Sequence, residues 1–106
     1  MDFIMSHQFD AQTKRWEVAL NGEIDIFNST DFKNKLLELL AQHPGSLILD
    51  CEKLEYIDST ALGALVTVLK HVKSDDGQMY LKKIRPNLAK LFKITSLDKV
   101  FIIEGV

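Results

Sequence analysis

The stretch from Leu54 to Val72 reads LEYIDSTALGALVTVLKHV and joins a strand end to an amphipathic helix. Asp58, Ser59 and Thr60 stand at the junction. These residue types cap helix N-termini, because their side-chain oxygens accept hydrogen bonds from the first unpaired backbone N–H groups. Apolar residues then recur at three- and four-residue spacing, which predicts a core-facing stripe. The stripe consists of Leu62, Leu65, Val66, Leu69 and Val72.

The opposite side of this predicted helix is small and weakly polar rather than charged. The residues expected there are Thr60, Gly63, Ala64, Thr67 and His71, with Val68 at the flank. A solvated helix face ordinarily carries charged residues, whereas small side chains let another backbone approach closely. We therefore predict a docking face for a partner, with the Ser59 hydroxyl at its N-terminal end. The alternative is that Asp58 or Ser59 only caps the helix, because capping alone explains both residue types.

Upstream of this stretch, the pattern predicts two strands, a helix and a third strand. Residues 15–21 alternate apolar and polar side chains, which is the pattern of a strand with one solvent-exposed face. Residues 3–9 are expected to form the strand before them. A helix is expected from Thr30 to Gln42, where a following Pro-Gly pair stops it. Residues 46–51 contain the apolar run Leu47-Ile48-Leu49, which predicts a strand buried on both faces.

Downstream, a break at residues 74–77 separates the central helix from a strand at residues 78–84. A third helix is expected from Asn87 to Ile94, with Pro86 in its first turn, and residues 99–103 form the last strand.

The resulting order, β-β-α-β-α-β-α-β, predicts an α/β fold: a mixed sheet with helices packed on it, in one domain over residues 1–106. Function in open α/β sheets commonly lies beyond the carboxyl end of a strand, at the start of a helix. Asp58-Ser59-Thr60 stands at such a point.

The composition argues against several classes of partner. The 106 residues carry a formal net charge of -2 without a Lys/Arg run, so we expect no nucleic-acid partner. No apolar segment approaches the roughly 20 residues of a membrane span, and the N-terminus lacks a signal-peptide pattern, so we expect no direct membrane contact. The single cysteine, Cys51, fits a reducing compartment. We expect a cytoplasmic protein that is a monomer or a weak dimer.

The sequence contains no recognisable catalytic or metal-binding motif. Ser59 lacks the G-x-S-x-G elbow, and the spacing of His7, His43 and His71 nominates no base; the alternative is a triad assembled only through space. One Cys and three scattered His give no pair of metal ligands, and there is no Gly-rich phosphate loop. We therefore expect no catalytic residues, no metal and no cofactor, and a protein that is not an enzyme.

Residues 56–63, Tyr-Ile-Asp-Ser-Thr-Ala-Leu-Gly, resemble the signature of the STAS domain found in bacterial anti-sigma factor antagonists, Asp-Ser-(Ser/Thr)-Gly-(Leu/Ile). Gly22-Glu23-Ile24-Asp25 is similar to the family's Gly-Glu-(Leu/Ile)-Asp segment, and residues 91–101 resemble its last helix–strand junction. Two positions depart from the pattern: Ala61 stands where the family usually has Gly, and Ser96 where Gly often precedes Leu. The extra methyl group of Ala61 is expected to affect how closely a partner approaches.

The resemblance implies a regulatory binding module. Such a domain binds an anti-sigma factor that is itself a serine kinase and thereby frees a sigma factor. The kinase phosphorylates the first hydroxyl of the signature, here Ser59, which releases the domain, and a separate serine phosphatase resets it; Thr60 is the second candidate for modification. The implied partner-binding residues are Asp25, Asn28, Ser29, Asp58, Thr60, Gly63, Ala64 and Thr67.

Two alternative roles use the same fold. One is an accessory subunit that docks on the ATPase of a lipid or anion transporter, generally without needing a phosphorylated hydroxyl. The other is a component of a larger stress-signalling assembly, in which Thr60 is also modified.

Overall fold

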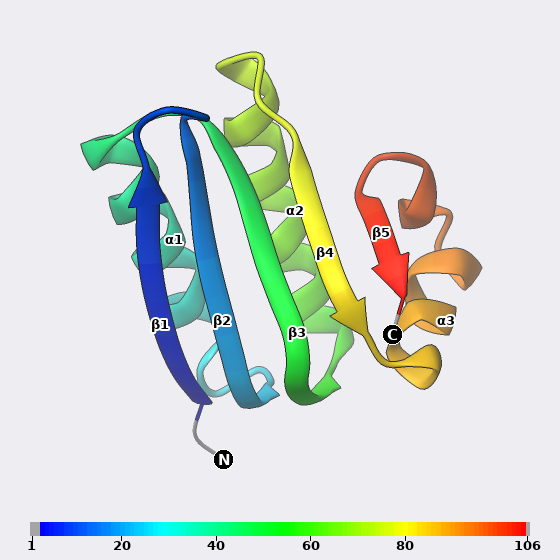
Figure 1. Ribbon diagram of the computed structural model, residues 1–106. Helices are drawn as coiled ribbons and strands as arrows, with labels where there is room; N and C mark the ends of the chain where they lie inside the picture. Colours follow the sequence, from blue (N-terminus) through cyan, green and yellow to red (C-terminus); the bar gives the residue numbers. More distant parts are fainter. Residues whose placement is uncertain (1–2, 106) are drawn as a thin grey trace.

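The computed structural model describes residues 3–105, which form a five-stranded sheet flanked by helices (Figure 1). The strands are β1 (Phe3–Asp10), β2 (Arg15–Ile24), β3 (Ser46–Ile57), β4 (Met79–Ile84) and β5 (Ile102–Gly105). The helices are α1 (Ser29–Gln42), α2 (Ser59–Ser74) and α3 (Pro86–Ile94), and a short 3-10 helix, η1 (Leu97–Lys99), precedes β5. The predicted order β-β-α-β-α-β-α-β is confirmed.

The strands lie in the sheet in their order along the chain. β1 is antiparallel to β2, as a hairpin requires, whereas β2, β3, β4 and β5 run parallel to their neighbours. Right-handed crossovers that step in one direction across a sheet put their helices on the same face. Accordingly, α1 and α2 lie behind the sheet in Figure 1, and the facing side of the sheet is uncovered there.

The uncovered face explains a difference in β3 from the prediction. Leu47 and Leu49 are buried between the sheet and the helices, but Ile48 points to the other face and is only half-buried. The expectation of a strand buried on both faces is therefore wrong. β3 also continues beyond Cys51 as far as Ile57, so it delivers the chain directly to the start of α2.

α2 buries a different stripe from the one predicted. Leu62, Leu65, Leu69 and Val72 are buried as expected, but Val66 is only half-buried. Val68 and Ala61 are both 0% exposed, because α2 packs against α1 as well as against the sheet. The methyl group of Ala61 therefore lies in the core, and the expectation that it affects partner approach is wrong.

The last strand begins later than predicted. β5 starts at Ile102 rather than at residue 99, because residues 97–99 form η1. Just before η1, Ser96 adopts a left-handed backbone conformation with φ of 61°. Glycine adopts this conformation without the steric strain that a Cβ causes, so Ser96 occupies a backbone position that favours glycine.

Cys51 is a core residue of β3. Burial, with a further contribution from the charge of Asp50, raises the pKa of its thiol to about 12. The thiol is therefore protonated at neutral pH and packs as a small apolar side chain rather than as a reactive nucleophile. Within residues 3–105, no helix has the length and apolar character needed to cross a membrane.

Candidate functional site

The predicted site lies where β2 and β3 end side by side, at the lower end of the sheet in Figure 1. Because the two strands are parallel, their last residues, Ile24 and Ile57, pair directly in the sheet. Asp25 follows the first strand and Asp58 follows the second. The loop that leads into α1 and the turn that leads into α2 therefore meet at the carboxyl edge of the sheet.

Asp58 caps α2 and also ties α2 to the neighbouring loop. Its Oδ1 accepts a hydrogen bond from the Ala61 N–H at 2.8 Å, the bond of a helix N-cap. Its Oδ2 accepts from the Ile26 N–H at 2.9 Å, in the β2–α1 loop. Asp58 is thus the capping residue, and the neighbouring Ser59 lies exposed as the first residue of α2.

The β2–α1 loop is held in shape by Asp25 and Asn28. Asp25 Oδ1 accepts from the Phe27 N–H at 2.9 Å, and Asn28 Oδ1 accepts from the Asp25 N–H at 2.9 Å. Asn28 Nδ2 also donates to the Glu23 carbonyl oxygen at 2.9 Å. These half-buried side chains therefore fix the loop. Ser29 is only 3% exposed, so its hydroxyl lies beneath the surface on which a partner would dock.

The same loop exposes two large apolar side chains that sequence reasoning did not single out. Phe27 is 88% exposed and Ile26 is 62% exposed. A signal was present, because two bulky apolar residues stand between Asp25 and Asn28, whose residue types favour turns. In a strand one of two adjacent side chains would face the core, whereas a turn can present both to solvent.

The predicted docking face of α2 is open over its first turns. Thr60, Gly63 and Thr67 are exposed, and Ala64 is half-buried. A Cβ atom placed on Gly63 would meet no other atom within 4 Å. The Thr67 hydroxyl donates to the Gly63 carbonyl oxygen at 3.2 Å, so it is satisfied within the helix. The surface from Ser59 to Thr67 is therefore uncharged and carries little side-chain bulk.

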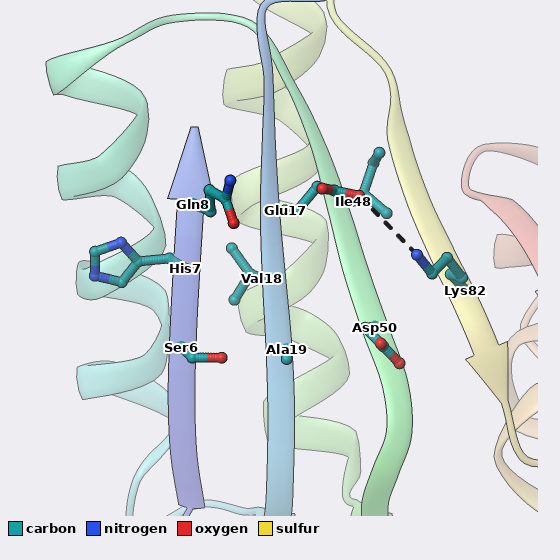
Figure 2. A pocket seen from close by; sticks show the side chains of 9 residues that line it. All are labelled: Ser6, His7, Gln8, Glu17, Val18, Ala19, Ile48, Asp50 and Lys82. Carbon is teal, nitrogen blue, oxygen red and sulfur yellow. Dashed lines mark ion pairs between the residues drawn. The ribbon is translucent and has the colours of Figure 1, made fainter. Parts of the chain in front are cut away.

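A separate hollow of about 340 Å³ lies on the uncovered face of the sheet (Figure 2). The small side chains of Ser6 and Ala19 lie among its lining residues, and Glu17 and Lys82 border it as an ion pair at 4.0 Å. None of the predicted site residues lines this hollow. In the part of the chain that the structure describes, no group of three or more His, Cys, Asp or Glu side chains could hold a metal ion.

Asp58→Ala is expected to lower the free energy of unfolding by about 1–2 kcal/mol, because it removes the cap of α2 and leaves the Ile26 N–H without its acceptor. Asp58→Asn keeps one side-chain oxygen and should recover part of this loss. The measurement is urea unfolding followed by circular dichroism. Thr60→Ala, at an exposed neighbouring position, is the control and should stay within about 0.5 kcal/mol of wild type. A loss of similar size for Thr60→Ala would contradict the role given to Asp58.

Comparison with known proteins relates nearly the whole chain to one family. The STAS domain model matches residues 4–105. The anti-sigma-B factor antagonist of Staphylococcus aureus (strain NCTC 8325 / PS 47) is 30% identical over 95 residues, which cover 89% of this chain and 88% of the relative. The anti-sigma-B factor antagonist of Bacillus subtilis (strain 168) is 33% identical over 89 residues, which cover 84% of this chain and 81% of the relative.

Solved structures share the fold at lower identity. A candidate anti-sigma factor antagonist from Thermotoga maritima superimposes with a TM-score of 0.87 at 23% identity, covering 96% of this chain and 86% of its own. The Bacillus cell fate determinant SpoIIAA in its phosphorylated form superimposes with a TM-score of 0.70 at 19% identity, covering 94% of this chain and 92% of its own. At these identities the likeness concerns the fold alone.

Proposed function

The chain belongs to the STAS-domain family, among the anti-sigma factor antagonists, and we propose that it binds an anti-sigma factor with serine-kinase activity and thereby frees a sigma factor. In this proposal the kinase phosphorylates Ser59, which ends the binding, and a serine phosphatase restores it. The protein acts in the cytoplasm as a binding module, without catalysing a reaction itself.

The observation that carries this proposal is that the Ser59 side chain is exposed and that the helix cap next to it is made by Asp58, not by Ser59. Asp58 holds the N-terminus of α2 through the Ala61 N–H, so modifying the Ser59 hydroxyl leaves the cap in place. A kinase can therefore reach this hydroxyl without opening the helix. The two curated relatives are named as antagonists of an anti-sigma factor, and SpoIIAA is known in a phosphorylated form.

The α2 face from Ser59 to Thr67 supports the same proposal as a contact surface. Its exposed positions carry Ser, Thr and Gly, so a partner backbone can approach the helix closely. Close approach places the Ser59 hydroxyl within the interface itself. A group added to this hydroxyl then acts directly on the contact between the two proteins.

A phosphoryl group at Ser59 is compatible with the folded domain. It adds about -1.5 to -2 charge, and at a helix N-terminus this charge gains roughly 0.3–1 kcal/mol from the helix dipole and free N–H groups. In the complex the same group must lose its water and needs space that the Ser59 hydroxyl does not occupy. The switch therefore acts across the interface, rather than by unfolding the domain.

The proposed function is tested by intact-mass measurement after incubation with ATP and the candidate anti-sigma kinase of the same genome. The wild type is expected to gain one phosphoryl group, and Ser59→Ala is expected to gain none. A gain that survives in Ser59→Ala would shift the assignment to Thr60. No gain with any anti-sigma kinase of the genome would contradict the proposal and favour docking on a transporter ATPase.

A further inference from the structure

We propose that Ile26 and Phe27 form a hydrophobic anchor that inserts into an apolar pocket of the anti-sigma partner, bordered by Lys or Arg side chains. This inference rests on the proposed function and adds to it the contact that supplies most of the binding energy. The α2 face allows close approach, but Gly63 has no side chain, and those of Ala64 and Thr67 are small and offer little area to bury. Binding hot spots are large side chains, often aromatic, at well-packed positions.

The anchor is an apolar surface held on a fixed backbone. Phe27 is 88% exposed and Ile26 is 62% exposed, so nearly the whole aromatic ring and most of the aliphatic side chain are available to a partner. The backbone beneath them is held by the bonds from the Phe27 N–H to Asp25 Oδ1 and from the Ser29 N–H to the Asp25 carbonyl oxygen, at 2.9 and 2.8 Å. A loop fixed before binding loses little conformational entropy on association.

The anchor lies beside the phosphate acceptor. The Ile26 N–H donates to Asp58 Oδ2 at 2.9 Å, and Ser59 is the next residue along the chain from Asp58. Both therefore belong to one continuous surface at the carboxyl edge of β2 and β3. A partner that reaches the Ser59 hydroxyl is therefore close enough to contact the anchor as well.

The charges around the anchor define the kind of partner. The chain as a whole is nearly balanced, with 13 Lys and Arg against 15 Asp and Glu. The anchor belongs to residues 23–31, which meet residues 55–64 through the bond from the Ile26 N–H to Asp58 Oδ2. Neither segment contains Lys, Arg or His, and the nearest basic residues along the chain are Lys33 and Lys53. The charged residues of the two segments are Glu23, Asp25, Asp31, Glu55 and Asp58. Electrostatic complementarity with these acidic residues favours a partner pocket that is bordered by basic side chains.

The same carboxylates argue against two other occupants. A second copy of this chain would bring two acidic surfaces together, and like charges placed face to face oppose association. An anionic lipid surface attracts basic segments and would be repelled by this acidic one.

The anchor is tested by calorimetric binding of the unphosphorylated protein to the anti-sigma kinase. Phe27→Ala is expected to weaken binding by about 30-fold or more, equivalent to about 2 kcal/mol, and Phe27→Leu by less. Ile94→Ala is the matched control, because Ile94 is 69% exposed at the end of α3, and it should bind within about twofold of wild type. Raising the salt concentration from about 0.05 to about 0.5 M should weaken wild-type binding.

The possible outcomes distinguish a failure of the anchor proposal from a failure of the proposed function. Suppose that wild type binds the kinase and is phosphorylated at Ser59, and that Phe27→Ala binds equally well. This result would overturn the anchor proposal and leave the proposed function intact. Wild-type affinity that does not fall with salt would overturn the basic border of the pocket. Wild type that neither binds nor is phosphorylated would overturn both proposals. Thermal unfolding of each variant checks that the exposed substitutions leave the fold unchanged.

Discussion

Gly63→Glu is expected to weaken binding of the anti-sigma partner by at least about 100-fold, equivalent to about 2.8 kcal/mol, while the domain stays folded. Gly63 is exposed on the α2 face that begins at Ser59. In the proposed complex, the absence of a side chain at this position lets the partner come close. Glu puts a long charged side chain at that contact. In the interface the Glu carboxylate would lose its water without gaining an opposite charge to pair with, which costs binding free energy.

The same substitution should stabilise the free protein slightly. A Cβ at Gly63 meets no atom within 4 Å, so the new side chain extends into solvent. Gly is disfavoured in helix interiors relative to Glu, and the replacement should raise the free energy of unfolding by about 0.5 kcal/mol. Lost binding together with a small gain in stability cannot result from local unfolding.

Calorimetric titration of the kinase and urea unfolding measure the two effects. Thr13→Glu places the same charge in the turn between β1 and β2, at the other end of the sheet, and should bind like wild type. Gly63→Ala adds only a methyl group and should fall between wild type and Gly63→Glu. Gly63→Glu that binds within about threefold of wild type would exclude this face of α2 from the interface.

The order of elements could be predicted because local chemistry marks the ends of each one. Pro and Gly stop α1, Asp58 starts α2, and Pro86 starts α3. Which faces are covered could not be predicted, because that depends on where the helices pack. Because Ile48 belongs to an apolar run, the sequence predicts a core residue, yet Ile48 lies half-buried on the side of the sheet away from the helices.

The candidate site, too, could be predicted only as far as local residue types determine it. The residue types at positions 58–60 indicate a cap and an exposed hydroxyl, but they leave open which residue caps the helix. The choice of Asp58 depends on a non-local contact, since its second oxygen accepts from the Ile26 N–H in another loop. The exposure of Phe27 was missed although the turn-forming residues around it gave a signal, because an aromatic residue is by default assigned to the core.

Phosphorylation of Ser59 is expected to lower affinity for the anti-sigma partner by at least about 100-fold without unfolding the domain. We expect the free protein to accept the phosphate dianion, because the N-terminus of α2 offers its dipole and N–H groups. In the complex it must be desolvated, and the neighbouring Asp58 and Asp25 carboxylates add to the negative field that any buried phosphate meets. The negative charge therefore weakens the complex but leaves the folded domain intact.

Two variants divide this effect into its parts. Ser59→Ala removes the acceptor without adding charge, so it should bind within about threefold of wild type and resist modification. Ser59→Asp should bind less tightly than Ser59→Ala but more tightly than the phosphorylated protein, because one carboxylate imitates a phosphate only in part. Calorimetry ranks the affinities, and an amide NMR spectrum of the phosphorylated protein reports its fold. A collapsed spectrum would mean that the switch unfolds the domain, whereas a dispersed spectrum with undiminished affinity would mean that Ser59 lies outside the interface.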